Sequence, residues 1–195
     1  ENALTNGKII ISDNGCGMTS DTLHEALRLG SETNKSKDTD DLGRFGTGLK
    51  ASAISIGKVF KIITKHKDDD YFTAIYNIEI GIKKNTWEFP VIRKSTNEEI
   101  ETLKMYGVKN TGTYLEITHL DGLSNKNSTQ FSSIVIKRVG EIFRYKLSRR
   151  NKDGKIKIYV NTKLVEPIDP MGRDFKDTLI EEISKIKEKE KEGKR

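Results

Sequence analysis

The chain has 195 residues, 34% of them hydrophobic, and a net charge of +6 from 35 basic and 29 acidic residues. This content suits a packed core, and no apolar run is long enough to cross a membrane and no signal peptide is visible. The single cysteine, Cys16, excludes an internal disulfide, and the three histidines show no metal-ligand spacing. These features favour a cytoplasmic globular protein.

The first element in chain order is a short β-branched run, Ile-Ile-Ile at residues 9–11, which predicts a buried strand. It leads into Asp13-Asn14-Gly15-Cys16-Gly17-Met18. A carboxylate at the rim of a buried strand needs a hydrogen-bond donor, and the exocyclic amine of adenine is one. Gly15 and Gly17 can take positive φ and leave room for a flat ring. The same letters also form an ordinary turn signal, so this run alone favours a turn.

A polar segment without hydrophobic period follows at residues 30–42 and predicts a long loop. Its serines and lysines, Ser31, Lys35, Ser36 and Lys37, are suited to a lid that closes over bound phosphates. A solvated surface loop explains the same letters equally well. Both interpretations stay open from the sequence.

The second glycine-rich run is Gly43-Arg44-Phe45-Gly46-Thr47-Gly48-Leu49-Lys50, and it opens an apolar helix predicted to end at Gly57. A glycine-rich loop that enters a helix presents backbone N–H groups and the positive end of the helix dipole, which together attract anions. Lys50 adds a point charge suited to phosphate. The alternative is a glycine-rich bend needed only for close packing.

The rest of the chain alternates strand and helix patterns. Strands are predicted over residues 58–65, 71–78, 86–92, 109–119 and 155–160, and helices over 96–106 and 128–147. Residues 165–171 contain two of the three prolines and predict irregular structure. From Asp174 onward, mixed charges at helical spacing indicate a solvated helix. We therefore expect one domain over residues 1–172 and a charged helical tail over 173–195.

These motifs resemble those of the GHKL ATPases, the superfamily of DNA gyrase, the large heat-shock chaperone, histidine kinases and MutL. Asp13-x-Gly15-x-Gly17 is similar to the adenine-binding motif, and Gly43-x-x-Gly46-x-Gly48 to the phosphate-binding motif. Residues 110–117, which include Thr113, resemble a later strand motif. The pattern is most similar to the MORC branch, with heat-shock-chaperone-like ATPase domains as the alternative, and the resemblance covers about residues 8–161.

The resemblance implies a Bergerat fold, an α/β two-layer sandwich with a mixed β-sheet and helices on one face. It implies that Asp13 accepts from the adenine amine, that Gly17 lets the base approach and that Met18 lies against the ring. Thr113 would donate its hydroxyl to the adenine edge or to a bound water. Backbone amides from Phe45 to Leu49 would surround the phosphates. The nucleotide-binding set is then Asp13, Gly15, Gly17, Met18, Gly43, Phe45, Gly46, Thr47, Gly48, Leu49, Lys50 and Thr113.

One departure from the family pattern concerns catalysis. The family carries, on a helix before the first motif, a glutamate that activates water and an asparagine that holds magnesium. The few residues between Glu1 and Asp13 cannot form a helix, a return turn and a strand. We therefore expect both residues upstream of Glu1, in a longer parent that uses ATP and Mg²⁺, forms a homodimer and contacts DNA through attached domains. The present chain is expected to hydrolyse ATP very slowly or not at all.

Two other classes of function stay open from the sequence. The domain can be a degenerate scaffold that keeps the fold and serves as an interaction module without nucleotide. It can also be a DNA-associated module that uses basic residues such as Lys146, Arg149 and Arg150, with salt-dependent affinity.

Overall fold

The computed structural model describes residues 7–28, 48–86, 91–121, 127–147 and 156–170. The chain divides into two compact units, residues 1–126 and residues 127–195. Most of the predicted site residues belong to the first unit's described segments, while Gly43, Phe45, Gly46 and Thr47 lie outside the described residues, as do the predicted loop at 30–42 and the charged tail. The expectation of a single domain over 1–172 stays a prediction.

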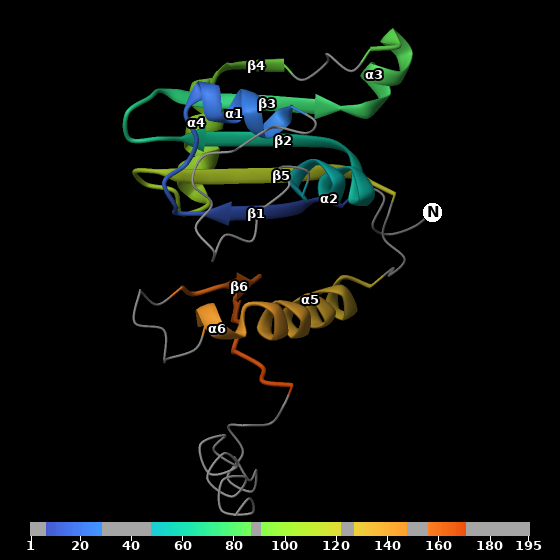
Figure 1. Cartoon of the computed structure of the whole chain (residues 1–195), viewed down its shortest axis with the longest axis vertical. Helices are drawn as coiled ribbons and strands as arrows, with labels where there is room; N and C mark the ends of the chain where they lie inside the picture. The colour runs from blue at the N-terminus through green and yellow to red at the C-terminus, as the bar shows by residue number, and fades with distance from the viewer. Residues whose placement is uncertain (1–6, 29–47, 87–90, 122–126, 148–155, 171–195) are drawn as a thin grey trace, which may run out of the picture. The chain divides into compact units, whose positions relative to one another are not determined.

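The first unit is built on a five-stranded sheet with the strand order β1-β5-β2-β3-β4 (Figure 1). All four pairings are antiparallel. The tight turn at residues 66–70 joins one of these pairs directly, and the other three pairs join strands that are further apart in the chain. The strands are β1 (Ile9–Asp13), β2 (Gly57–Lys65), β3 (Tyr71–Asn77), β4 (Val91–Lys94) and β5 (Gly112–Leu120). The α/β fold class is confirmed, although the described sheet is antiparallel rather than mixed.

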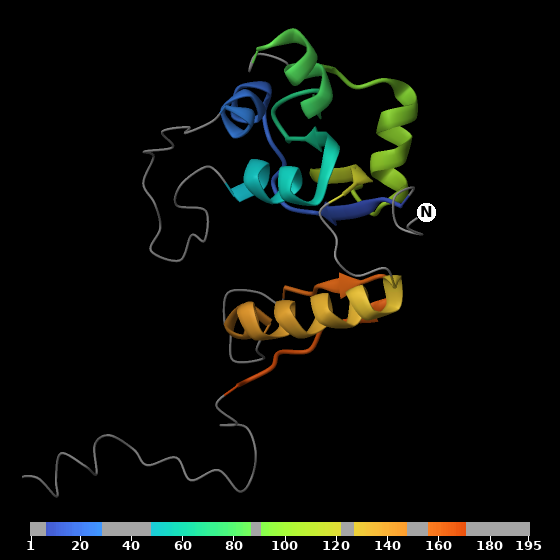
Figure 2. The same cartoon turned by 90° about the vertical axis from the view of Figure 1, so that its right-hand side faces the viewer.

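Helices α1 (Ser20–Leu27) and α2 (Gly48–Ile56) cover one face of this sheet, and α4 (Asn97–Met105) covers the other (Figure 2). The structure therefore differs from the expected arrangement with helices on one face only, because α4 also packs against the sheet through the buried Leu103. Local signals set the helix ends. Thr19 caps α1, and Thr96 forms a reciprocal capping box with Glu99 at the start of α4.

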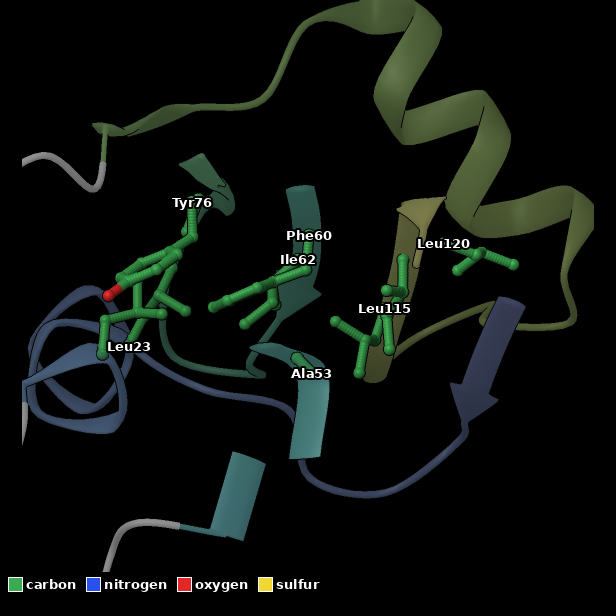
Figure 3. Close-up of a cluster of buried hydrophobic side chains, with 10 residues drawn as sticks. Leu23, Ala53, Phe60, Ile62, Tyr76, Leu115 and Leu120 are labelled. Carbon is green, nitrogen blue, oxygen red and sulfur yellow. The ribbon is translucent and has the colours of Figure 1, made fainter. Parts of the chain in front are cut away.

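The alternation of side chains along the strands separates two buried clusters. On the α1–α2 face, Phe60 and Tyr76 stack with ring centroids 4.6 Å apart. Figure 3 shows how this cluster is assembled from both helices and three strands, through Leu23, Ala53, Phe60, Ile62, Tyr76, Leu115 and Leu120. On the α4 face the buried side chains are Ile63, Leu103, Val108 and Tyr114. Each large apolar side chain buried in this way contributes about 1.5–3 kcal/mol.

Helix α3 (Ile78–Lys84) directly follows β3 and was not among the predicted elements. Its boundaries come from two asparagines, since Asn77 caps the N-terminus and Asn85 takes a left-handed conformation at the C-terminus with φ 48°. β4 begins at Val91, later than the predicted strand, and residues 87–90 lie outside the described part of the chain.

The second unit contains α5 (Ser128–Ile142), α6 (Arg144–Leu147) and a hairpin of β6 (Tyr159–Val160) and β7 (Lys163–Leu164). The helix predicted over 128–147 is thus divided at Phe143, the C-cap of α5. Gly140 of α5 lies against the backbone after the hairpin, where its carbonyl oxygen accepts from Ile168 N–H at 3.0 Å. Within the described segments, none of the helices has the length and apolar content needed to cross a membrane.

Candidate functional site

Three polar side chains form one row across the sheet, which we call the polar row: Asp13 on β1, Thr113 on β5 and Thr64 on β2. In the register of the sheet Asp13 pairs with Thr113, and Thr113 pairs with Thr64. All three side chains lie on the α1–α2 face, because side chains an even number of positions apart on a strand point to the same face. Residues two positions from Thr64 and from Thr113, and four positions from Asp13, belong to the apolar cluster of that face. The polar row therefore lies where the apolar core of this face ends.

Thr64 connects the polar row to the first glycine motif. Its hydroxyl is fully buried and accepts from the Met18 N–H at 2.9 Å. It donates to the Gly112 carbonyl oxygen at 3.1 Å and lies 3.3 Å from the Thr113 hydroxyl. One side chain thus holds both the loop after Gly17 and the start of β5.

Gly17 and Gly112 are required by backbone packing. Gly17 has φ +69°, and a Cβ there would lie 1.9 Å from the Lys65 carbonyl oxygen. Gly112 has φ +144°, and a Cβ there would lie 2.1 Å from the Asp13 carbonyl oxygen. Larger residues at these positions would force the loop away from the sheet. The proposal that Gly17 also lets a base approach stays a prediction.

A second contact holds the loop from the other side. The Asp69 carboxylate, in the turn between β2 and β3, accepts from the Ser20 N–H at 2.9 Å. Hydrogen bonds from the Ser20 and Asp70 backbones lower the pKa of Asp69. The amides of Met18 and Ser20, on either side of Thr19, are therefore both bound by side chains of β2 and its turn.

The Asp13 carboxylate is exposed and bends toward the glycine loop. One of its oxygens accepts from the Gly15 N–H at 2.8 Å, and among the described residues no side chain or amide is bonded to the other. Thr113 beside it is only partly buried. Together they present acceptor atoms at the open edge of a rigid sheet, which suits a ligand that carries N–H donors.

The second predicted motif is described only from Gly48. Gly48 begins α2, and among the described residues no atom lies within 4 Å of the position that a Cβ would take there. Leu49 packs against the apolar cluster of the α1–α2 face. The first turn of α2 is thus fixed to the core through Leu49.

Lys50 has a different environment from the one expected for a phosphate ligand. It is fully buried, and its ammonium donates to the Ala26 carbonyl oxygen at 3.0 Å and to that of Arg28. Burial lowers the pKa of Lys50. In this structure the ammonium therefore binds carbonyl groups at the C-terminal end of α1, and its role at a phosphate stays a prediction.

Sequence reasoning did not identify Thr64 and Asp69. Thr64 carried one usable signal, since it is a polar residue on the apolar side of the predicted strand 58–65. No comparable signal marked Asp69, because any of three consecutive aspartates in that turn could have reached α1. Within the described segments, no three His, Cys, Asp or Glu side chains are grouped so as to hold a metal ion.

The antiparallel sheet, the polar row and the glycine loop held against it define a domain of the GHKL type. Residues 1–113 match the family described as "Histidine kinase-, DNA gyrase B-, and HSP90-like ATPase", and the chain belongs to this family.

Among curated proteins the chain is similar to MORC ATPases. It is 26% identical over 91 residues to ATPase MORC2B and to ATPase MORC2A of Mus musculus, and 25% identical over 91 residues to ATPase MORC2 of Homo sapiens. The matched region covers 45% of this chain and 9% of each relative. The chain therefore spans only a small part of the length of these proteins.

Proposed function

We propose that this chain is an ATP-binding domain in which the polar row holds the adenine ring. The observation that carries the proposal is the alignment of Asp13 and Thr113 on adjacent strands, beside a glycine loop that Thr64 and Asp69 hold in place. Asp13 would accept from the exocyclic amine through the oxygen that is bonded to none of the described residues. Gly15, Gly17 and Met18 would border the ring.

The phosphates would extend toward the first turn of α2. The backbone N–H groups of a helix N-terminus and the helix dipole both favour an anion there. We propose that Gly43, Phe45, Gly46, Thr47 and Leu49 contribute amides, as family membership suggests. For Lys50 to join them, its ammonium would have to leave the carbonyl groups of Ala26 and Arg28.

We assign hydrolysis, and any role of magnesium in it, to a longer protein that contains this domain. Among the described residues no three His, Cys, Asp or Glu side chains are grouped to hold a divalent cation, and we propose no metal ligand among them. The similarity to MORC ATPases, named as such, supports an ATPase role for the parent. Lid closure over residues 30–42, homodimerisation, contact with DNA and a cytoplasmic location belong to the same proposal.

The direct test is ATP titration of the chain and of Asp13→Asn by isothermal calorimetry. The substitution keeps the size of the side chain and removes its charge, and it puts an amide donor where the adenine amine must be accepted. We expect affinity for ATP to fall by about 100-fold or more, because a binding group would face an unpaired partner. Asp121→Asn, which removes the same charge just beyond the other end of β5, is the matched control and should bind ATP like the unchanged chain.

Two results would contradict the proposal. Equal affinity of the Asp13→Asn variant would show that the carboxylate does not hold the base. A complete lack of ATP binding by the folded, unchanged chain would favour the nucleotide-free interaction module instead.

A further inference from the structure

The sheet of the first unit ends in β1 on one side and in β4 on the other, and no described strand pairs with the outer side of either (Figure 1). An edge strand leaves alternate backbone N–H and C=O groups without a partner, so proteins commonly protect such edges with charges or cover them. The two edges differ in this protection. Strand β4, Val-Ile-Arg-Lys, carries two positive charges in its four residues. Strand β1, Ile-Ile-Ile-Ser-Asp, carries only the charge of Asp13, at its end.

The surface beside β1 is apolar on both faces of the sheet. Ile11 lies on the α1–α2 face and its side chain is 56% exposed. On the α4 face the Ser12 hydroxyl donates to the Tyr106 carbonyl oxygen at 3.0 Å, which places the end of α4 next to β1. Tyr106 is 43% exposed, and the neighbouring Met105 is 82% exposed. A strand added to the edge of β1 would therefore find apolar side chains on each side of the sheet.

The sequence of β1 is suited to pairing with β1 of a second copy. A two-fold axis perpendicular to the sheet relates two such antiparallel strands, and Ile11 then lies opposite Ile11 of the copy. In this register Asp13 of each strand lies opposite Ile9 of the other, so the two carboxylates stay apart. Strand β4 is less suited to the same arrangement, because its two adjacent positive charges would be brought close to those of the copy.

We propose that the outer edge of β1 is the surface through which two copies of this chain associate, as one continuous antiparallel sheet. The inference goes beyond the proposed function, since pairing of two β1 strands needs no nucleotide. Backbone hydrogen bonds between the strands supply affinity, and Ile11, Met105 and Tyr106 of each copy lose contact with water. Because β1 has only five residues, the interface is small, and the dimer should dissociate on dilution.

Sedimentation velocity without nucleotide, over about a hundredfold range of chain concentration, tests the inference. We expect a monomer–dimer equilibrium that Ile11→Lys weakens at least about tenfold, because two ammonium groups then meet at the two-fold axis. Val91→Lys is the matched control, since Val91 is also 56% exposed and lies on the other edge strand, and it should dimerise like the unchanged chain. Equal weakening by both substitutions would overturn the inference. A monomer at every concentration would also overturn it and would leave this edge to a strand of a different protein.

A charge-exchange experiment tests the register directly. Ile11→Glu should dimerise as poorly as Ile11→Lys, because two carboxylates then meet at the axis. An equal mixture of the two variants should associate at least about tenfold more tightly than either alone, because an ammonium then faces a carboxylate. Such recovery also shows that both variants are folded. If both are folded by circular dichroism and the mixture does not associate, the pairing of β1 with β1 is wrong.

The outcome for the proposed function is read separately. Failure of the unchanged chain to bind ATP would contradict the proposed function and leave this inference standing, because the association is measured without nucleotide. ATP binding by a chain that is monomeric at every concentration would overturn the inference alone.

Discussion

Two polar clusters lie on opposite faces of the same sheet, and they differ in how completely their groups are bonded. On the α1–α2 face is the polar row of Asp13, Thr113 and Thr64. On the α4 face is the Glu99 cluster, formed by Glu99 with Thr73, Arg93 and Thr96. The Glu99 carboxylate accepts from Arg93 at 2.8 and 2.9 Å, from the Thr73 hydroxyl at 2.9 Å and from the Thr96 amide at 2.9 Å.

Both oxygens of the Glu99 carboxylate accept hydrogen bonds, whereas one oxygen of the exposed Asp13 carboxylate has no bonding partner among the described residues. A polar network whose groups are all hydrogen-bonded stabilises the fold but has no free donor or acceptor for a ligand. A rigid network with a free acceptor can bind one. Burial by itself would raise the pKa of Glu99, but the hydrogen bonds from Arg93, Thr96 and Thr73 outweigh it and hold the pKa at about 2. The buried charge of Glu99 therefore belongs to the fold, whereas the polar row is where we propose that the ligand binds.

The largest expected effect comes from Gly17→Ala, which separates the glycine loop from strand β2 beside the polar row. The added Cβ would collide with the Lys65 carbonyl oxygen in a left-handed backbone, so the loop must leave Thr64. We expect a loss of about 3 kcal/mol in the free energy of unfolding and no measurable ATP binding. Urea denaturation and calorimetry measure the two effects.

Gly107→Ala is the matched control for this variant. Gly107 also has a positive φ, +90°, but its Cβ position has no neighbour within 4 Å. The control therefore carries the backbone strain without the collision, about 1 kcal/mol, and should bind ATP normally. Equal losses in the two variants would mean that conformational strain, and not the contact with β2, makes Gly17 necessary.

A smaller effect, confined to stability, is expected for Glu99→Gln. The neutral amide cannot accept all four hydrogen bonds, and we expect a loss of about 2–3 kcal/mol at pH 7 with unchanged ATP affinity. The folded pKa of about 2 lies below the unfolded value of about 4.3, so this stabilisation is complete above pH 4.3 and is lost as the pH falls toward 2. The stability difference between the chain and the variant should therefore disappear near pH 2.

Denaturation at pH 7, 4.5 and 2.5 follows this convergence, with Glu98→Gln on the exposed side of α4 as the control. Glu98→Gln should change stability by less than about 0.5 kcal/mol at every pH. Weaker ATP binding in Glu99→Gln would show that the two faces are coupled and that the division into a structural and a functional cluster is incorrect.

The sequence predicted the strands that carry the polar row, and the helix that begins near Gly48, because local signals decide them: apolar runs and glycines at turns. It placed Asp13 and Thr113 in one site only through the family resemblance, since the pairing of β1 with β5 is a long-range contact. Thr64 and Asp69 were missed for the same reason, because their partners Met18 and Ser20 lie more than 40 positions away. The position of helix α4 on the second face was also missed, since its pattern does not say which face it covers.

The smallest expected effect tests whether Lys50 belongs to the structural or to the binding part of the molecule. Lys50→Met keeps the length of the side chain and leaves the Ala26 and Arg28 carbonyl groups without their donor. We expect a stability loss of about 1 kcal/mol. Because the ammonium is buried away from solvent and already bonded, the affinities for ATP and for adenosine should change by the same small factor.

Lys58→Met removes an exposed lysine that pairs with Glu79 at 3.2 Å and serves as the control for loss of one positive charge. It should change stability by no more than about 0.5 kcal/mol, as exposed ion pairs do. Weaker binding of ATP with unchanged binding of adenosine in Lys50→Met alone would show that the ammonium moves to the phosphates when nucleotide enters. Lys50 would then belong to the binding site together with the polar row. Its bonds to the Ala26 and Arg28 carbonyl groups would exist only in the nucleotide-free state, because the ammonium must release them to reach a phosphate.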